Sequence, residues 1–151
     1  FYSTTFDGMM SKPYHARCYF KKAKTKAKQT SDLEGWRNLR WRDQNVLRRH
    51  FGEDEIPGVN DGNESLESLV QKWKSGNISP ADENELEWKI NDNLVENCSL
   101  NEVREILIVN DQANTGGENA LRRRCAQGMI LGALERCPRC NKGQLHFDDV
   151  A

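Results

Sequence analysis

The sequence lacks the marks of a membrane protein, a secreted protein and a nucleotide-using enzyme. None of its apolar runs approaches the roughly 20 residues that a membrane-spanning helix needs, and its start shows no signal-peptide pattern. It contains neither a glycine-rich phosphate loop nor a credible catalytic dyad. Hydrophobic residues make up only 36% of the 151 residues. That content suits one ordinary domain or two small ones, without a membrane partner.

Charge is unevenly distributed along the chain, although the net charge is only −1. Residues 1–52 carry 12 Lys and Arg against 4 Asp and Glu, whereas residues 53–100 carry 3 against 12. A basic module followed by an acidic segment favours a nucleic-acid contact at the front. A solvated surface is the alternative, and two modules of opposite charge could also dock on each other.

Five cysteines are present, and two of them form the Cys137-Pro138-Arg139-Cys140 motif. Two thiolates at this spacing can bind one face of a tetrahedral zinc ion. Pro138 and Gly143 suit a tight turn that directs backbone N–H groups at the sulfurs. Cys98 and Cys125 have no partner at metal-motif spacing, so we expect small buried apolar residues there.

His15-Ala16-Arg17-Cys18 supplies a second pair of potential zinc ligands. A surface histidine near a buried cysteine is the plainer interpretation of this pair. His15, Cys18, Cys137 and Cys140 could also form one composite site in a stand-alone DNA-binding or protein-binding module without an enzymatic partner. A thioredoxin-like redox role for Cys137 and Cys140 is disfavoured, because such motifs follow a strand and begin a helix.

Arginines alternate with aromatic residues in GWRNLRWRDQ, and a lysine run, KKAKTKAK, precedes them. Arginine and aromatic groups together can clamp phosphates and stack on bases. The alternatives are core tryptophans with solvated arginines, and a flexible lysine loop or a nuclear-import signal. Trp36, Leu39 and Trp41 fit a short strand or turn, and Asp43–Phe51 fits a helix capped by Gly52.

Residues 53–78 read as an acidic linker with at most one short helix. Residues 79–134 read as a subdomain of three helices that begin near Ser79, Ser99 and Glu118. Trp88 lies off the apolar stripe of the first of these helices, so it predicts either a contact with another domain or a second packing face. The apolar run before Cys137 would join this subdomain to the Cys137 turn.

Two stretches resemble the nuclear DNA-dependent poly(ADP-ribose) polymerases. Residues 84–147, with LEWKI, NEVREILI and GMILGALERCPRC, are similar to the third zinc-binding region of that family. FDGMMSKPYHARCYF and GWRNLRWRDQ resemble the DNA-break-sensing zinc finger of the same family. The resemblance implies an α+β fold of small zinc-binding modules. Their bounds would be a partial finger at 1–52, a linker at 53–78, a helical subdomain at 79–134 and the start of a zinc ribbon at 135–151.

The resemblance also implies roles for single residues. Zinc would be bound by His15, Cys18, Cys137 and Cys140, and DNA ends by Phe6, Met10, Arg17 and Arg40. Leu39, Trp41 and Trp88 would contact other domains. The missing ligand pairs would lie before Phe1 and after Ala151, so the sequence predicts an internal fragment. It departs from the family's usual order, because one finger is joined to the third region through a short linker.

At the level of the whole protein, the resemblance implies the break-sensing and relay part of a nuclear DNA-repair enzyme that transfers ADP-ribose from NAD to protein. The catalytic domain of that glycosyltransferase would lie outside these residues. The chain itself would bind zinc and DNA but no NAD, and it would have no activity alone.

Overall fold

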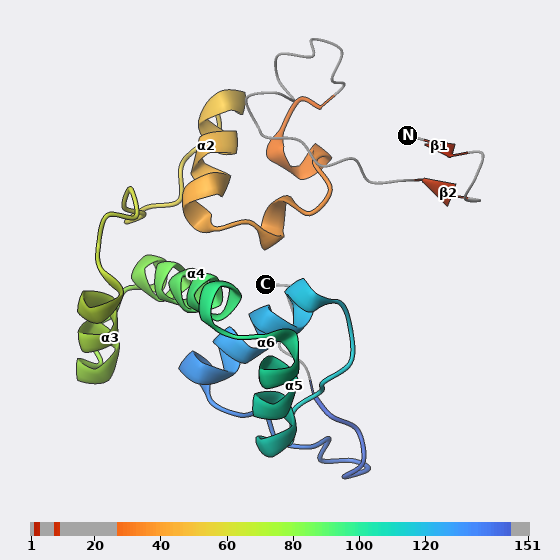
Figure 1. The fold of residues 1–151 in the computed structure, drawn as a ribbon. Helices are drawn as coiled ribbons and strands as arrows, with labels where there is room; N and C mark the ends of the chain where they lie inside the picture. Colours follow the sequence, from red (N-terminus) through yellow and green to blue (C-terminus); the bar gives the residue numbers. More distant parts are fainter. Residues whose placement is uncertain (1, 4–7, 10–26, 146–151) are drawn as a thin grey trace.

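The computed structural model describes residues 2–3, 8–9 and 27–145, and helices dominate this part (Figure 1). Strands β1 (Tyr2–Ser3) and β2 (Gly8–Met9) pair antiparallel, with Tyr2 opposite Met9. The short 3₁₀ helices are η1 (Thr30–Asp32) and η2 (Trp36–Asn38). The α-helices are α2 (Trp41–Phe51), α3 (Leu66–Ser75), α4 (Pro80–Asn97), α5 (Leu100–Val109) and α6 (Glu118–Leu131).

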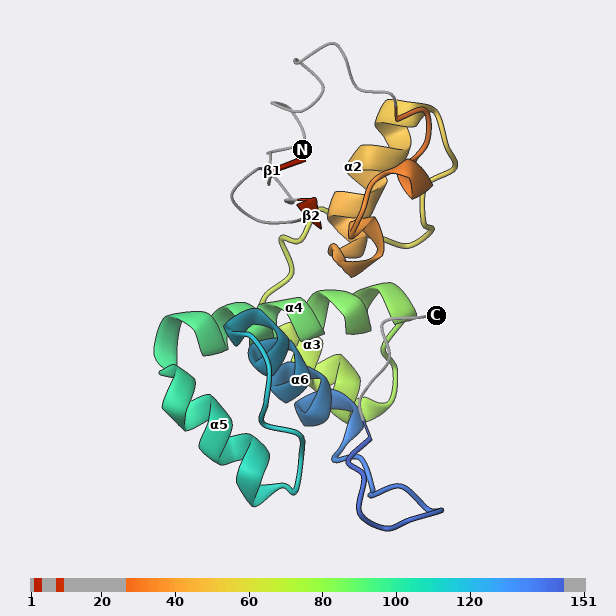
Figure 2. The same ribbon diagram turned by 90° about the vertical axis from the view of Figure 1, so that its right-hand side faces the viewer.

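Helices α3 to α6 are called here the helical unit, in which α4 packs against α3 and α6, and α5 packs against α6 (Figure 2). Leu94, Val103, Leu107, Leu121, Cys125 and Ala126 form one buried cluster. Leu69, Leu86 and Ile130 form a second cluster that includes α3. Burial of such side chains contributes about 1.5–3 kcal/mol each. Helix α3 therefore belongs to the core of this unit, even though its sequence lies within the predicted linker.

The predicted helix starts at Ser79 and Ser99 are confirmed. The Ser79 hydroxyl accepts a hydrogen bond from the Asp82 amide, and Pro80 occupies the first turn of α4. Ser99 and Glu102 form a reciprocal capping box at the start of α5, as the sequence pattern indicated. Cys125 is buried in the core, and Cys98 packs against the same cluster.

Residues 27–56, called here the α2 unit, form a smaller body around α2. Gly52 ends α2 in the left-handed conformation with φ of 69°, which confirms it as the C-cap. Thr30 is buried and its hydroxyl donates to Glu53 at 2.6 Å, so η1 is tied to the end of α2. The alternative of a strand at Trp36–Trp41 is wrong, because Trp36–Asn38 is a 3₁₀ helix and Trp41 already lies in α2.

The α+β expectation is not confirmed by the described residues. Their extended pairing is limited to β1 with β2 and to one isolated bridge between Arg136 and Gln144. No helix in the described part of the chain is long and apolar enough to cross a membrane.

Candidate functional site

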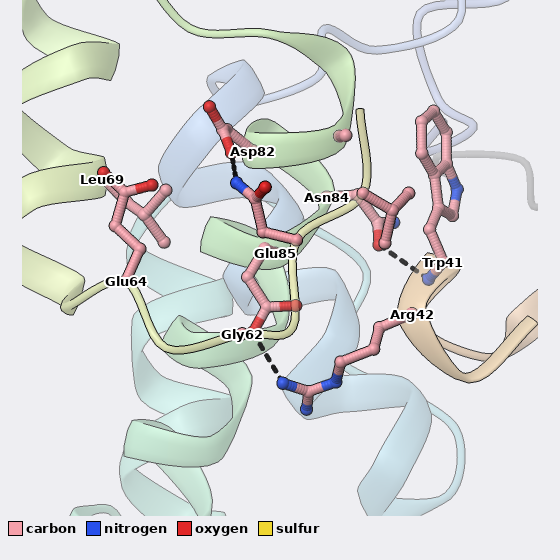
Figure 3. A pocket seen from close by; sticks show the side chains of 11 residues that line it. Trp41, Arg42, Gly62, Glu64, Leu69, Asp82, Asn84 and Glu85 are labelled. Carbon is pink, nitrogen blue, oxygen red and sulfur yellow. Dashed lines mark hydrogen bonds and ion pairs between the residues drawn. The ribbon is translucent and has the colours of Figure 1, made fainter. Parts of the chain in front are cut away.

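Three consecutive residues at the start of α2 join the α2 unit to the helical unit. The Trp41 amide donates to Asn84 Oδ1 at 3.1 Å. The Arg42 guanidinium lies 3.7 Å from a Glu85 carboxylate oxygen, and Figure 3 shows the Arg42 side chain extending towards Gly62 and Glu85. Because these partners lie on the polar side of α4, the apolar stripe of that helix remains free to pack on the helical core.

Arg40 is held in what we call the Arg40 seat, formed by Glu85, Trp88 and Asp92 of α4. Its guanidinium forms an ion pair with Asp92, lies 5.4 Å from the centre of the Trp88 ring, and lies 3.9 Å from Glu85. The Arg40 side chain is only 16% exposed. A residue that was predicted to contact DNA phosphate therefore lies in an interface within the chain.

Arg123 of α6 also lies against the Trp88 ring. The Arg123 guanidinium lies 3.9 Å from the ring centre and forms a 2.7 Å ion pair with Glu87. Two guanidinium groups near one indole ring fit the attraction of a cation to the π-electrons. Trp88 therefore packs within the helical unit and also meets the α2 unit, while its expected contact with another domain stays a prediction.

Residues 57–64, called here the strap, run between α2 and α4 and line a small hollow with α3 (Figure 3). The Asp61 carbonyl accepts a hydrogen bond from Arg42 at 3.1 Å, and the Gly62 carbonyl accepts one from Lys89 at 3.1 Å. Asn60 donates to Asp82 at 3.3 Å. The strap therefore bonds to both α2 and α4 at the junction, mainly through its backbone carbonyls.

Trp36 of the α2 unit, like Trp88 of α4, has two arginines near its ring. The guanidinium groups of Arg37 and Arg48 lie 5.6 and 5.4 Å from the centre of the Trp36 ring. Leu39 is 38% exposed, and its carbonyl accepts from Gln44 at 2.9 Å. Arginines of the Arg-aromatic segment therefore contact an aromatic ring of the same chain. Leu39 leaves part of its apolar side chain exposed.

Cys137 and Cys140 lie in a tight turn. The Asn141 amide donates to the Cys137 carbonyl, and the Cys137 amide donates to the Gly143 carbonyl, both at 2.8 Å. Asn141 takes the left-handed conformation, with φ of 51°, which asparagine tolerates better than most residues. Backbone N–H groups of Lys142 and Gly143 lower the pKa of the Cys140 thiol. The residue that allows the turn is therefore Asn141 rather than Gly143.

These features fit half of a zinc site. Paired cysteines with amides directed at a sulfur are suited to thiolate coordination, because the amides stabilise the negative charge. Among residues 27–145, no group of three or more His, Cys, Asp or Glu side chains could hold a metal. Cys137 and Cys140 would thus supply two of the four ligands of a zinc ion.

The turn is attached to the helical unit by polar contacts. Gln112, 7% exposed, donates to the Leu134 carbonyl at 2.9 Å and accepts from the Leu134 amide at 3.1 Å. Arg136 pairs with Asp111, which lowers the pKa of that carboxyl. The sequence indicated an apolar connection here, but Leu131 is 55% exposed and the connecting contacts are hydrogen bonds.

Several predicted site residues lie outside the described residues, namely Phe6, Met10, His15, Arg17 and Cys18. The structure adds residues that sequence reasoning missed. Asn84, Glu85 and Asp92 share one side of α4 with Trp88, and their helical spacing of three to four residues was a usable signal. Gln112 had no such signal, because nothing in a sequence distinguishes a buried glutamine from a surface one.

One family model and several known proteins match this chain. The model of the PADR1 N-terminal helical domain matches residues 78–132. Poly [ADP-ribose] polymerase 1 of Gallus gallus is 32% identical over 95% of the chain, and that of Arabidopsis thaliana is 29% identical over 89%. The Oryza sativa protein of the same name is 35% identical over 57% of the chain.

The chain spans a minor part of these relatives, 15% of the Gallus gallus protein and 16% of the Arabidopsis thaliana protein. The matched domain covers α4, α5 and α6, whereas the alignments to the relatives extend over both the α2 unit and the helical unit. The chain carries a PADR1 N-terminal helical domain and, over most of its length, is similar to one part of poly [ADP-ribose] polymerase 1.

Proposed function

We propose that this chain is the DNA-break-sensing and relay region of a nuclear, NAD-dependent protein ADP-ribosyltransferase. The finger that contains residues 1–52 contacts DNA ends, and the helical unit passes the bound state to a catalytic domain elsewhere in the protein. The residues of this chain provide binding and positioning, not the transfer chemistry. The protein as a whole would act in DNA repair.

The observation that carries this proposal is the junction at residues 40–42. A relay needs a physical connection between the part that senses and the part that responds. Arg40, Trp41 and Arg42 each contact α4 through a side chain or a backbone amide. The α2 unit and the matched PADR1 helical domain are therefore in direct contact, although a linker separates them in the sequence.

Zinc is the cofactor of this proposal, and NAD is a substrate of the whole enzyme that this chain does not bind. Cys137 and Cys140 would hold one zinc ion together with two further ligands, and His15 with Cys18 would hold another. Bound zinc would fix the fold of each small module. Zinc analysis of the intact protein should show one ion lost in Cys140→Ser and a different one lost in His15→Ala. Loss of the same single ion in both variants would support a composite site instead.

DNA contact is assigned to Phe6, Met10, Arg17 and Arg40. An apolar side chain can cover the bare face of the last base pair at a break without regard to sequence. Basic side chains nearby would hold the phosphates and make binding sensitive to salt. Leu39, Trp41 and Trp88 are assigned to contacts between domains.

The test is the affinity of the intact protein for a blunt-ended duplex, measured by fluorescence anisotropy. Phe6→Ala should weaken binding about tenfold, in line with the value of one stacked base. Val109→Ala is the matched control, because Val109 is an apolar residue 84% exposed on α5. Linearised plasmid should compete far better than closed circular plasmid of the same sequence. Equal competition by the two plasmids would contradict recognition of breaks.

A further inference from the structure

The end of α5 has an uncommon backbone conformation at Asp111. Its φ is +53°, in the left-handed region where glycine is the usual residue after a helix. The Asp111 amide donates to the Ile108 carbonyl at 3.0 Å, so this residue turns the chain out of α5. Glycine would make the same turn at a lower conformational cost. An aspartate at this position is explained if its side chain has a partner of its own.

That partner is Arg136, which directly precedes Cys137. Arg136 Nε donates to Asp111 Oδ2 at 2.7 Å, and Arg136 Nη2 donates to Oδ1 of the same carboxylate. One guanidinium therefore holds both carboxylate oxygens, in the two-point geometry that fixes direction as well as distance. The Asp111 and Arg136 side chains are 58% and 39% exposed, so the pair contributes more to geometry than to stability.

Both arms of the Cys137 turn contact Asp111. Arg136 and Gln144 pair with each other across the turn in an isolated bridge. The Gln144 side-chain amide also donates to the Asp111 carbonyl at 3.3 Å. We call Asp111, Arg136 and Gln144 the Asp111 clamp. Asp111 thus holds one arm of the turn through its carboxylate and the other arm through its backbone.

The clamp extends to the segment around the Cys140 sulfur. Arg136 Nη1 donates to the Lys142 carbonyl at 3.1 Å. The amides of Lys142 and Gly143 form hydrogen bonds to the Cys140 sulfur. One guanidinium consequently connects the end of α5 to the segment whose amides orient a proposed zinc ligand. Residues that orient metal ligands without touching the metal commonly set the affinity for that metal.

We propose that the Asp111 clamp positions Cys137 and Cys140 for zinc, so that the helical unit helps to orient the metal site. Asp111 and Arg136 are positioning residues that do not touch the metal. The proposal rests on the proposed function, because it needs zinc at these cysteines. It adds a coupling between the two parts: zinc binding holds the end of α5, and an ordered end of α5 raises the zinc affinity.

The experiment measures zinc affinity in the intact protein by competition with a chelator, for the ion that is missing in Cys140→Ser. The proteins are the wild type, Asp111→Asn, Arg136→Gln and the double variant. Asparagine keeps the size of the side chain and tolerates positive φ, but it offers the guanidinium only one acceptor oxygen. Each single variant should raise the zinc Kd about tenfold, as expected for residues that orient metal ligands. The double variant should bind zinc no more weakly than Arg136→Gln alone.

Glu135→Gln is the matched control for the loss of charge. Glu135 is exposed and lies next to Arg136, nearer in the sequence to the two cysteines than Asp111 is. The substitution removes the same charge but no residue of the clamp. The zinc Kd of this variant should therefore stay within about twofold of the wild-type value, as for most exposed charges.

The outcomes separate this proposal from the one on which it rests. If the wild type holds no zinc ion that Cys140→Ser lacks, the zinc site of the proposed function fails, and the clamp fails with it. If that ion is present and Asp111→Asn binds it as tightly as the wild type, the clamp is refuted while the zinc site stands. Equal weakening by Glu135→Gln and Asp111→Asn would refute the clamp in favour of general charge attraction.

Two further results bear on the positioning role. Additive losses of zinc affinity in the double variant would mean that Asp111 and Arg136 act separately, which overturns the clamp. With zinc removed, thermal unfolding of Asp111→Asn and Arg136→Gln should match that of the wild type. Earlier unfolding of the metal-free variants would assign the lost affinity to a weaker fold, and the positioning role would be refuted.

Discussion

At the scale of single residues, polar side chains in apolar surroundings define how the elements meet. Arg122 of α6 is only 5% exposed, yet its guanidinium donates to the carbonyls of Leu94 and Cys98 at 2.5 and 2.9 Å. The Leu94 carbonyl also accepts the Cys98 amide at 3.1 Å, so Arg122 adds a second hydrogen bond there and gives the Cys98 carbonyl a donor. A hydrophobic residue at position 122 would fill the space but would donate to neither carbonyl.

Gly62 gives a prediction about the junction. Its φ is +80°, and a Cβ there would lie 1.5 Å from the Arg42 guanidinium. Gly62→Ala should therefore displace Arg42 from Asp61 and Glu85, in addition to the backbone strain of about 1–2 kcal/mol that alanine meets in this conformation. Chemical denaturation should show a larger loss of stability than strain alone explains, by about 1 kcal/mol.

Gly76 is the matched control for that measurement. It has a similar φ of +74°, but nothing lies within 4 Å of the position of its Cβ. Gly76→Ala should show the backbone strain and no more. Equal destabilisation by the two substitutions would mean that the contacts of Arg42 contribute nothing measurable to stability.

At the scale of elements, the caps of α4 and α5 were readable from the sequence because capping is local. Ser99 accepts from the Glu102 amide, while the Glu102 carboxylate accepts from the Ser99 amide and hydroxyl at 2.7 and 2.8 Å. The capping box forms within residues 99–102, so the sequence of these four residues is enough to predict it. The same holds for Gly52, whose freedom to adopt positive φ ends α2.

The capping box predicts how stability depends on pH. The hydrogen bonds from Ser99 lower the pKa of Glu102 below its ordinary value. A group whose pKa is lower in the folded state stabilises the fold above its unfolded pKa, which is about 4.3 for glutamate. This contribution should be present at pH 7 and be lost as the pH falls through the folded pKa.

Thermal unfolding between pH 7 and pH 3 tests this sign. The difference in melting temperature between wild type and Glu102→Gln should be largest near pH 7 and shrink towards pH 3. Ser99→Ala removes the cap itself and should cost about 1 kcal/mol at pH 7. A difference between wild type and Glu102→Gln that grows on acidification would contradict the assignment.

The burial of helix α3 could not be predicted from its own sequence. Its sequence, between turn-forming residues, predicted at most one short helix within a linker. Leu69 is nonetheless fully buried against Leu86 and Ile130, which lie far along the chain. The hydrophobic pattern of α3 is short, so only the presence of α4 and α6 reveals it as part of the core.

At the scale of the whole molecule, the uneven distribution of charge explains how the two units meet. Basic residues at the start of α2 face acidic residues of α4, and Arg48 and Arg49 pair with Glu53 and Glu55 just after α2. The sequence allowed three interpretations of its charge: a nucleic-acid contact, a solvated surface or docking of the units. Docking is present in the structure, and DNA contact stays a prediction.

The candidate site was predictable in its types of residue and less so in its arrangement. Trp41 and Trp88 both lie where the α2 unit meets α4, whereas their expected contacts with other domains stay a prediction. The sequence did not place Arg40 on Trp88, because that contact spans 48 positions and a connection with little periodicity. Ion pairs over such a separation depend on how whole helices pack, which no local pattern records.

The double hydrogen bond between Gln112 and Leu134 has a consequence for dynamics. The Leu134 amide lies outside any helix, so it would ordinarily exchange its hydrogen with solvent within seconds. Because Gln112 holds it at 3.1 Å, its exchange should be slow, and Gln112→Ala should make it fast. Deuterium uptake of the peptide around Leu134, with that around Leu121 as an internal reference, would report whether the Cys137 turn moves with the helical core.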